Sequence, residues 1–553
     1  MRTVATLTMA AVMAACAPVS PAKPDSAATP SSTRYEDLVQ LFKDWRAFQQ
    51  PKVTDGVPDY TTAAMTAQSQ ALPAIQRRLR AIDPSGWTPA QQADYHVVRA
   101  EMNGLAFDHR VLKPWSNNPA FYQTVFSDQS DQPAREGPYA WGGLELYRYA
   151  FPLAGNDAAA IKASLEVVPR LLAQARSNLT GNEKDLWVYG ARTIKQQTDE
   201  LNGLEAKVKA ATPMLLPAIA AARAATDSFV AWVEQQAGSK TGPSGVGTEN
   251  YDWYLKNVQL VPYTWTEEVA LMRRELARAH AFLALEEVRN AKLPPQVPVA
   301  SAAEHEKQAG LAVKRYMAFL ADHQLMTIKP YLEPALRAKV GGFTPGARDF
   351  FTEVDYRDLE VMRTHGYHWF DLSRAANEPS ESPIRRGPLL YNIFNSRTEG
   401  FATGWEEMML QAGMFDGNPR SRELIYVLLG QRAARALGDL MMHANRLTLA
   451  EAARFAATNT PRGWLRESAA TVWFEQHLYL EQPGYGTSYL IGKIEVEKLL
   501  RSRVEQLGTE FTMKRFMDEF NAAGMVPISL IRWQLAGSSP DLVELLGESA
   551  KAP

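Results

Sequence analysis

Apolar residues recur every three or four positions through almost the whole of this 553-residue chain. In 35–50, Leu38, Leu41, Trp45 and Phe48 fall on one face of a helix. Only 293–300 could form a short strand or an extended loop. Further stretches with the helical pattern lie at 60–82, 89–112, 157–177, 183–208, 213–237, 264–290, 303–324, 329–338, 348–376, 398–415, 420–444, 448–458, 464–481, 486–507, 511–522 and 527–535. The pattern predicts an all-α fold, mainly helical, with at most a few short strands.

Proline and glycine clusters separate these stretches, and none of them is long enough to be a linker between domains. No repeat of fixed length divides the chain. We therefore expect one large helical domain over 34–537, which could consist of two lobes that divide near residues 240–250. Residues 538–553 are predicted to be a C-terminal tail.

Residues 1–15 are predicted to be a secretory signal peptide. One positive charge precedes an apolar run at 4–12, which is well short of the roughly 20 residues that cross a bilayer. Ala14 and Ala15 precede Cys16, as small residues do in a bacterial lipobox, although Met13 stands where leucine is usual. We expect Cys16 to be lipidated and to anchor the protein to a membrane. The alternative is ordinary secretion without a lipid.

Cys16 is the only cysteine of the chain, which favours lipidation over chance. A single cysteine also excludes an intramolecular disulfide and a cysteine-based zinc site. Residues 17–33 are rich in proline, serine and alanine and predict a flexible tether. Ala17, rather than aspartate, follows Cys16, which by the usual sorting rule indicates an outer-membrane lipoprotein facing the periplasm.

The charge balance excludes one class of partner. The chain has 59 basic and 61 acidic residues and a net charge of −2. Without a basic field, we expect no nucleic-acid binding. No stretch beyond the signal peptide approaches the length and apolarity of a membrane span.

Two histidines lie close together in the chain, at His365 and His368, with Asp371 after them. On one helix these three side chains would share a face and could ligate a divalent metal. Gly366 counts against a stable helix here, and a histidine pair at this spacing is more often structural than metal-binding.

Glu399 and Glu406 form a second candidate group. They lie two helical turns apart in a segment whose other residues are mostly apolar or aromatic, so both carboxylates should be buried. Buried carboxylates need a metal, an arginine or a hydrogen-bond network as partner. A structural ion-pair network with nearby arginines is the simpler alternative, and the arginines available are Arg385, Arg386, Arg397, Arg432 and Arg435.

Several short motifs follow one another in a set order along the chain: Gly247-Thr248-Glu249-Asn250-Tyr251, Ser382-Pro383-Ile384-Arg385, Glu399-Gly400-Phe401-Ala402, Arg432-Ala433-Ala434-Arg435 with Asp439 and His443, Pro483-Gly484 to Gly492, and 516–531. Their order resembles that of a bacterial family known as domain of unknown function 885, a group of large helical proteins. The resemblance covers most of 34–537.

The resemblance implies a zinc-peptidase-like helical scaffold. In the family, a His-Glu-x-x-x-x-His element would supply two metal ligands and a general base. The glutamate of its Glu-Gly-Trp-Ala helix, here Glu399, would be the third ligand. Such a site leaves one position open for water, whose pKa the metal lowers. The implied cofactor is zinc or another divalent metal.

The chain departs from the family pattern at the His-Glu motif. In the matching place only His368 aligns with a family histidine, and no glutamate follows His365. Tyr485 stands where the family's Pro-Gly-Gln-Ala segment has glutamine, and Leu478 stands where the pattern has arginine. The usual general base is therefore missing, which leaves open whether a metal is bound at all.

Three functions remain open at this point. A metal-dependent hydrolase of a peptide or another envelope substrate would use His365, His368 and Glu399 as ligands, with Asp371 or Glu406 orienting them or acting as the catalytic base. A non-catalytic periplasmic binding or envelope lipoprotein would have lost the metal. A metal-free glycosidase would use Glu399 and Glu406 as its acid/base pair. The retained Glu399 favours the first function, and the missing His-Glu motif favours the second.

Overall fold

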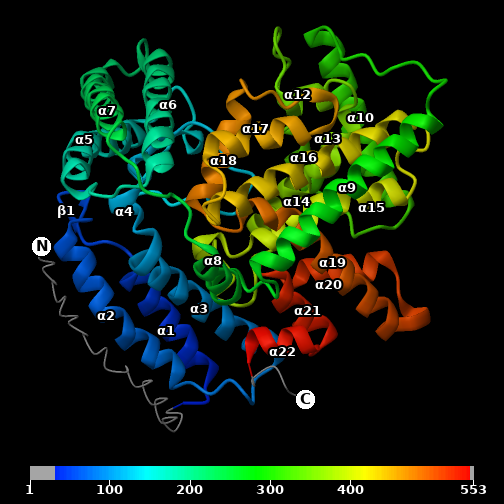
Figure 1. Cartoon of the computed structure of the whole chain (residues 1–553), viewed down its shortest axis with the longest axis horizontal. Helices are drawn as coiled ribbons and strands as arrows, with labels where there is room; N and C mark the ends of the chain where they lie inside the picture. The colour runs from blue at the N-terminus through cyan, green and yellow to red at the C-terminus, as the bar shows by residue number, and fades with distance from the viewer. Residues whose placement is uncertain (1–31, 548–553) are drawn as a thin grey trace, which may run out of the picture.

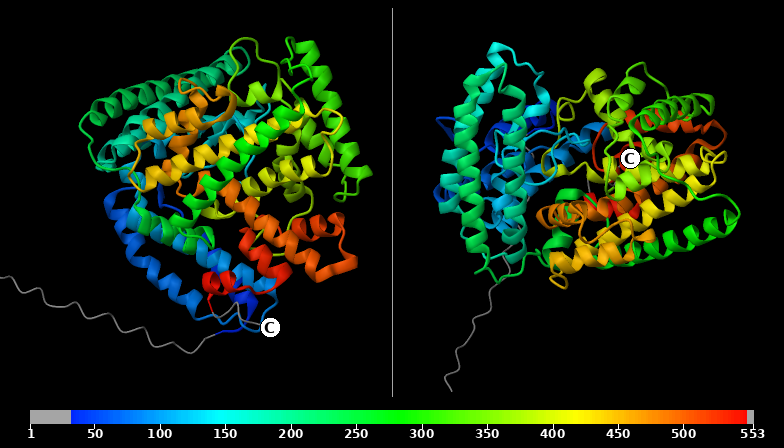
Figure 2. Two further views of the ribbon diagram at one scale, coloured as in Figure 1. Left: turned by 45° about the vertical axis from the view of Figure 1, so that its right-hand side comes forward. Right: turned by 90° about the horizontal axis from the view of Figure 1, so that it is seen from above.

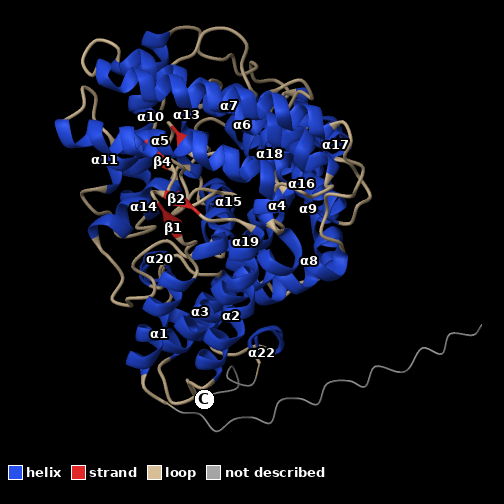
Figure 3. Cartoon of the chain, turned by 90° about the vertical axis from the view of Figure 1, so that its left-hand side faces the viewer, coloured by secondary structure: helices blue, strands red, loops and turns tan. Residues whose placement is uncertain are grey.

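The computed structural model describes residues 32–547, and this range is built almost entirely from α-helices (Figures 1 and 3). The signal peptide, Cys16 and most of the predicted tether lie outside the described residues. The prediction of an all-α fold is confirmed. The α-helices are α1 (Tyr35–Phe48), α2 (Thr62–Arg80), α3 (Pro89–Phe107), α4 (Pro114–Asn117), α5 (Gly155–Asn178), α6 (Lys184–Val208), α7 (Leu216–Ala237), α8 (Thr248–Tyr254), α9 (Trp265–Arg289), α10 (Ala302–Asp322), α11 (Leu332–Arg337), α12 (Phe350–Asp355), α13 (Leu359–His365), α14 (Tyr367–Asn377), α15 (Asn395–Gln411), α16 (Arg420–His443), α17 (Leu449–Asn459), α18 (Ala470–Glu481), α19 (Tyr485–Leu507), α20 (Met513–Ala522), α21 (Ile528–Ala536) and α22 (Pro540–Leu546).

Short elements connect these helices. Strand β1 (Val53–Thr54) pairs antiparallel with β2 (Val57–Pro58), and β3 (Val125–Phe126) pairs parallel with β4 (Leu144–Glu145). Residues 293–300, predicted as a strand or an extended loop, form a loop without regular structure. Two π-helices, η1 (Asp108–Leu112) and η5 (Leu255–Gln259), occur with the 3₁₀ turns η2 (Pro119–Tyr122), η3 (Leu146–Arg148), η4 (Pro213–Leu215), η6 (Leu390–Asn392), η7 (Pro461–Gly463) and η8 (Gly508–Glu510).

The loop 127–143 between β3 and β4 is held firmly at its base. The side-chain Oε1 of Gln197 on α6 accepts hydrogen bonds from the backbone N–H groups of Thr124 (2.7 Å) and Val125 (3.1 Å). The Leu144 N–H donates to the Thr124 carbonyl at 2.6 Å. Because the stem is fixed at both ends, the loop projects from a defined position.

Helices α5, α6 and α7 form a lobe with its own hydrophobic core (Figures 1 and 2). Ile161, Trp187 and Phe229, one from each helix, are fully buried in it. The larger core joins α1, α2 and α3 to the helices that follow α7. The lobe is therefore an insertion between α3 and α8. Its C-terminal border lies between Ala237 and Thr248.

The expectation that no further stretch approaches a membrane span is wrong for one segment. Pro213–Ala237 reaches a mean hydropathy of 1.2 over a span-length window with few charges. In the structure, Ile219, Phe229 and Val233 of this helix are fully buried against α5 and α6. These residues form the buried face of α7, and 39% of the apolar window is buried in the lobe.

Helices α15 and α19 touch backbone to backbone at two glycines. A Cβ built on Gly400 would lie 2.3 Å from the Cα of Gly492, and one built on Gly492 would lie 2.0 Å from the Ser396 carbonyl oxygen. Only glycine allows so close an approach. This crossing brings Glu399 of α15 beside Tyr485 in the first turn of α19.

The stretch 348–376, predicted as one helical stripe, forms the three helices α12, α13 and α14. Gly366 separates α13 from α14, where a Cβ would lie 2.5 Å from the side chain of Leu336 and 3.0 Å from the Arg363 carbonyl oxygen. His365 ends α13, and His368 lies in the first turn of α14. The two histidines therefore come from two helices, and the prediction of one shared helical face is corrected.

Both ends of the described chain are more structured than the sequence indicated. Ser32, placed in the tether, donates its N–H to the Ala81 carbonyl and accepts from the Asp83 N–H at 2.9 Å. The predicted tail contains α22, whose Leu542 and Leu546 are buried in the main core. The folded body thus reaches from 32 to at least 546, beyond the expected limits of 34 and 537.

Candidate metal centre

Glu399 lies on α15 with only 3% of its surface exposed, and its two carboxylate oxygens have different surroundings. Oε1 accepts three hydrogen bonds, from Tyr485 Oη (2.6 Å), Gln132 Nε2 (3.0 Å) and Tyr489 Oη (3.2 Å). Oε2 faces His368 Nε2 at 3.4 Å. The donors therefore saturate one oxygen and leave the other directed at an imidazole.

The atoms that face each other in this pair, Glu399 Oε2 and His368 Nε2, are both buried and have no partner other than each other, at 3.4 Å. Buried polar atoms in folded proteins are almost always satisfied, so an unsatisfied pair needs an explanation. A carboxylate oxygen and an imidazole nitrogen are both ligands of divalent metals. The donor set thus fits a metal ion.

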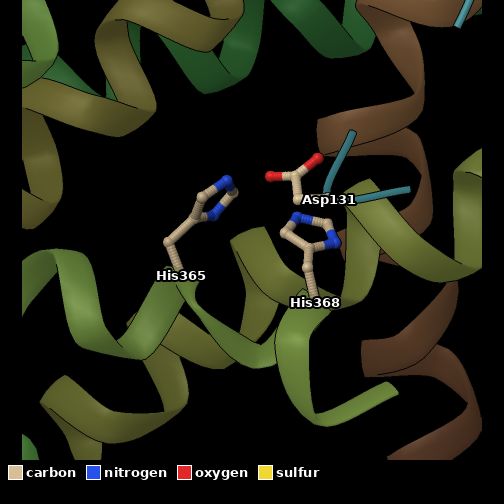
Figure 4. A group of neighbouring side chains, drawn as sticks. All are labelled: Asp131, His365 and His368. Atoms are coloured by element: carbon tan, nitrogen blue, oxygen red, sulfur yellow. The ribbon is translucent and has the colours of Figure 1, made fainter. Parts of the chain in front are cut away.

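Two further groups of side chains lie around the same point. Ligand atoms of Asp131, His365 and His368 all lie within 4.8 Å of one another, and so do those of Asp131, Glu136 and Glu399. Figure 4 shows the two imidazoles and the Asp131 carboxylate directed toward one another. Asp131 belongs to both groups and therefore links the predicted ligands His365, His368 and Glu399 into one cluster.

The electrostatics of this cluster favour a bound cation. Burial alone would lower the pKa of His368, but Asp131 and Glu399 outweigh it and raise that pKa to about 9. Burial alone would raise the pKa of Glu399, but His368, His365 and the Tyr485 hydroxyl lower it to about 2. Burial together with Asp131 and Glu399 raises the pKa of Glu136 to about 7. Three crowded carboxyl groups create a negative field. A proton on His368 neutralises part of it, and a metal ion bound to the neutral imidazole would take the place of that proton.

Glu406 is placed behind His365. It is completely buried and receives two hydrogen bonds from Arg432, at 2.6 and 2.8 Å. Its Oε1 also lies 2.9 Å from His365 Nδ1. A carboxylate on the far nitrogen of a histidine fixes the orientation of the ring. Of the two predicted roles for Glu406, this position suits orientation of a ligand, because Arg432 and His365 occupy its oxygens.

Asp371 has a different setting from the one predicted. Arg397 donates to both of its oxygens, at 2.8 and 3.0 Å, and Arg374 adds a third hydrogen bond at 3.0 Å. An aspartate held by two arginines is a structural anchor, so Asp371 does not stand ready as a base. The glycosidase reading also fails, because Glu406 is buried and fully paired.

Tyr485, which departs from the family pattern, contacts the centre directly through its hydrogen bond to Glu399. Its position is fixed by Asp439 of α16, whose carboxylate accepts the Gly486 N–H at 2.8 Å in the first turn of α19. The change from glutamine to tyrosine therefore lies at the candidate centre.

Sequence reasoning missed Asp131, Gln132 and Glu136, which come from the loop 127–143. A signal was present: this segment is rich in proline, glycine and acidic residues and lacks the helical pattern of its surroundings. Functional residues are often carried on such loops. Nothing in the local sequence, however, relates the loop to a helix more than 200 residues later.

Two solved structures share this fold. A "putative lipoprotein of unknown function" from Shewanella oneidensis is 16% identical, with a TM-score of 0.64 over 90% of this chain and 97% of its own. A "putative lipoprotein" from Colwellia psychrerythraea is 15% identical, with a TM-score of 0.66 over 91% of this chain and 98% of its own. No curated protein matches the sequence. The model of the family described as "Bacterial protein of unknown function (DUF885)" matches residues 47–367 and 368–535, and the protein therefore belongs to this family.

Proposed function

We propose that this protein is a divalent-metal-dependent hydrolase of peptide or amide bonds at the bacterial cell envelope. One observation carries the proposal: Glu399 Oε2 and His368 Nε2, both buried and with no partner other than each other, meet beside Asp131 and His365. Two imidazoles and two carboxylates are a suitable ligand set for zinc, manganese or iron.

His365, His368, Glu399 and Asp131 would hold the metal. A bound divalent metal would supply Lewis-acid activation of a carbonyl group and lower the pKa of a water molecule. The chain's own residues prepare this chemistry. The hydroxyl of Tyr485 holds one oxygen of Glu399, so that the other points to His368.

Glu136 is the carboxylate placed to take a proton in this proposal. Its ligand atoms lie within 4.8 Å of those of Glu399 and Asp131, and its Oε1 lies 3.4 Å from the Tyr485 hydroxyl. Unlike Glu406 and Asp371, it has no arginine partner among residues 32–547. A general base must reach the attacking water, and Glu136 would replace the glutamate that is missing after His365.

A second candidate is a non-catalytic metal-binding lipoprotein of the envelope. The observation in its favour is that Gly366 follows His365, where the family motif has its catalytic glutamate. Both candidate functions require a bound metal, and only the first requires hydrolysis. One set of variants therefore distinguishes the two functions.

The envelope location rests on the N-terminus and on the two similar structures. The signal-like start and the lone Cys16 predict export and lipidation. Both similar proteins are described as lipoproteins, which supports the same assignment for this chain. We propose an outer-membrane lipoprotein facing the periplasm.

Metal content and peptidase activity test the proposed function together. Purified protein should contain about one zinc, manganese or iron ion per chain by plasma mass spectrometry. His368→Ala and Glu399→Gln should each lose it, whereas His323→Ala, at an exposed histidine that ends α10, should not. A protein without metal, or variants that retain it, would overturn the proposal.

Glu136→Gln separates the two candidates. A hydrolase predicts that this variant retains metal and loses at least about 100-fold in the rate of peptide hydrolysis, because only the base is removed. If the metal-loaded wild type cleaves none of a mixture of peptides, the non-catalytic candidate replaces the hydrolase.

A further inference from the structure

A cavity of about 400 Å³ lies outside the metal cluster. None of Asp131, His365, His368 and Glu399 lines it. Arg135 and Gly137 line it from the two positions that flank Glu136, so the segment around Glu136 separates the cavity from the candidate centre. Seven aromatic side chains contribute to its wall: Tyr60, Trp115, Phe121, Tyr139, Trp141, Tyr254 and Tyr391.

Asp108 gives this aromatic cavity an unpaired acid. It is the first residue of the π-helix η1 and is half-buried. No side chain or backbone group within the described range donates a hydrogen bond to its carboxyl group or forms an ion pair with it. Burial raises its pKa to about 8. Without a partner the buried group is held in its protonated form, and a cation beside it would stabilise the carboxylate instead.

The remaining charged groups of the wall are already engaged. The Glu481 carboxylate accepts a hydrogen bond from Asn118 Nδ2 at 2.6 Å. The Arg135 guanidinium stacks on the ring of Phe126, 4.1 Å from its centroid, and donates to the Asp128 carbonyl. Asp108 is therefore the one acid of the cavity wall to which no described residue donates a hydrogen bond.

Three irregular backbone segments meet at this cavity. The π-helix η1 supplies Asp108, and the π-helix η5 begins directly after Tyr254. Tyr391 and Asn392 both have left-handed backbones, with φ of 57° and 47°. Single π-turns are frequent at functional sites, and a left-handed non-glycine residue costs about 1–3 kcal/mol. Their convergence on one cavity indicates a site shaped for a ligand.

Gln482 adds an unused donor to the same wall. Its Oε1 accepts hydrogen bonds from the Gly137 N–H (2.9 Å) and from Asn392 Nδ2 (3.1 Å). Its Nε2 is buried and has no partner. The residue itself is 6% exposed. A ligand in the cavity could therefore present an acceptor to Gln482 and a cation to Asp108.

We propose that this cavity binds a small organic cation, in which a primary ammonium group pairs with Asp108 and an aromatic or aliphatic body packs against the rings. Aromatic faces attract cations, and this attraction adds to the ion pair when both are desolvated. Trp141 is 45% exposed, which places it at the entrance. The inference goes beyond the proposed hydrolase and does not depend on a bound metal.

Isothermal titration calorimetry at pH 8.5 with 2-phenylethylamine tests the inference. The uncharged 2-phenylethanol and the anionic 3-phenylpropionate have bodies of similar size and serve as probes without the cation. The amine should bind at least about tenfold more tightly than either. Equal binding of all three, or amine binding weaker than about 1 mM, would overturn the inference.

Variants assign the binding to this cavity. Asp108→Asn should weaken amine binding at least about tenfold, and Trp141→Ala, a truncation at an exposed position, should weaken it without affecting the fold. Asp322→Asn, at an exposed aspartate of α10, should bind as the wild type does. His368→Ala should also bind the amine normally, because His368 belongs to the metal cluster and does not line the cavity. Unchanged binding by Asp108→Asn would contradict the inference.

Discussion

At the scale of single residues, Glu399 shows how the chain could reserve a ligand atom. Three donors, from Gln132, Tyr485 and Tyr489, all bind its Oε1. The other oxygen keeps a single neighbour, His368. Hydrogen bonds to a ligating carboxylate fix its direction and hold it ionised. The donors on Oε1 thus orient Oε2 toward the candidate metal position.

Tyr485→Phe tests this orientation. The change removes the 2.6 Å hydrogen bond to Glu399 without removing the ring. We expect metal affinity to fall about 10- to 100-fold, as it does when other such supporting residues are changed. Competition with a chelating dye measures the affinity. Tyr95→Phe, at a tyrosine of α3 remote from the cluster, is the control, and an equal loss in both variants would refute the role of Tyr485.

Asp108 predicts a stability that depends on pH with a definite sign. Its pKa is about 8 in the folded protein because of burial, and near 3.9 in an unfolded chain. Between these values the folded state holds one more proton, so the free energy of unfolding falls as pH rises. Asparagine at this position has no proton to lose, so the Asp108→Asn variant does not lose this stability as the pH rises. The variant should exceed the wild type by about 2 kcal/mol or more at pH 8, and match it near pH 4.

Urea unfolding at both pH values measures this difference. Asp322→Asn should show no such gain, because its carboxylate is exposed. If Asp108→Asn is less stable than the wild type at pH 8, the carboxylate has a stabilising partner in solution and the account of the cavity is wrong. If Asp108→Asn is more stable than the wild type and also binds the amine less tightly, Asp108 serves ligand binding at a cost in stability.

The sequence could predict part of the candidate site at this scale. Glu399 and His368 stood out because their residue types and order resemble a family pattern, and His365 stood out because it lies three positions before His368. Asp131 and Glu136 could not be predicted, because their relation to α14 and α15 exists only in the folded chain. The roles of Asp371 and Glu406 depended on which arginine each meets, and spacing along a helix does not determine that.

At the scale of secondary structure, the crossing of α15 and α19 builds the centre. Gly400 and Gly492 allow the backbones to touch, which places Tyr485 and Tyr489 over Glu399. The sequence predicted both helices from their apolar periodicity. It could not predict which glycines mark a crossing, since α15 also contains Gly404, where a Cβ would meet only ordinary contacts at 3.5 Å or more.

Gly492→Ala tests the crossing. Its Cβ would lie 2.0 Å from the Ser396 carbonyl oxygen, so the helices must separate. We expect a loss of at least about 1–3 kcal/mol in the free energy of unfolding, as for overpacked cores, and weaker metal binding. Gly404→Ala is the matched control and should be neutral or slightly stabilising, because alanine favours a helix. Similar effects in both variants would contradict the account.

The break at Gly366 shows a limit of periodicity. Apolar spacing continues through 348–376 and predicts one helix, but Gly366 ends α13 after His365, and α14 begins at Tyr367. The close approach of Leu336 leaves no room for a side chain there. Tertiary packing therefore decided where the helix ends, and it directed the two histidines toward each other.

At the scale of the whole molecule, the candidate centre joins two parts of the fold. The loop 127–143 rises from a stem attached to α6 in the lobe, while His365, His368 and Glu399 belong to the main body. Figure 2 shows the lobe beside the body rather than within it. The sequence indicated a division near 240–250. It did not indicate that the chain leaves the main body after α3 and returns to it at α8, so that α1, α2 and α3 share a core with the later helices.

Cys16→Ala tests the proposed location. In a Gram-negative host, the wild type should fractionate with membranes and gain the mass of a lipid on its N-terminal peptide. The variant should be found in the soluble fraction, because Cys16 is the only cysteine and the proposed lipid would have no other place of attachment. Asp322→Asn, at an exposed position of the folded body, can serve as a control for altered expression. A membrane-bound Cys16→Ala would show that another feature holds the protein there.

The central claim is that His368 and Glu399 hold a metal together with His365 and Asp131. An anomalous difference map at the zinc edge, from crystals of the protein grown with zinc, tests this claim most directly. The account predicts one strong peak about 2.0–2.2 Å from a nitrogen of His368 and from Glu399 Oε2. A map with no peak at this position, or with peaks only at surface residues, would contradict it.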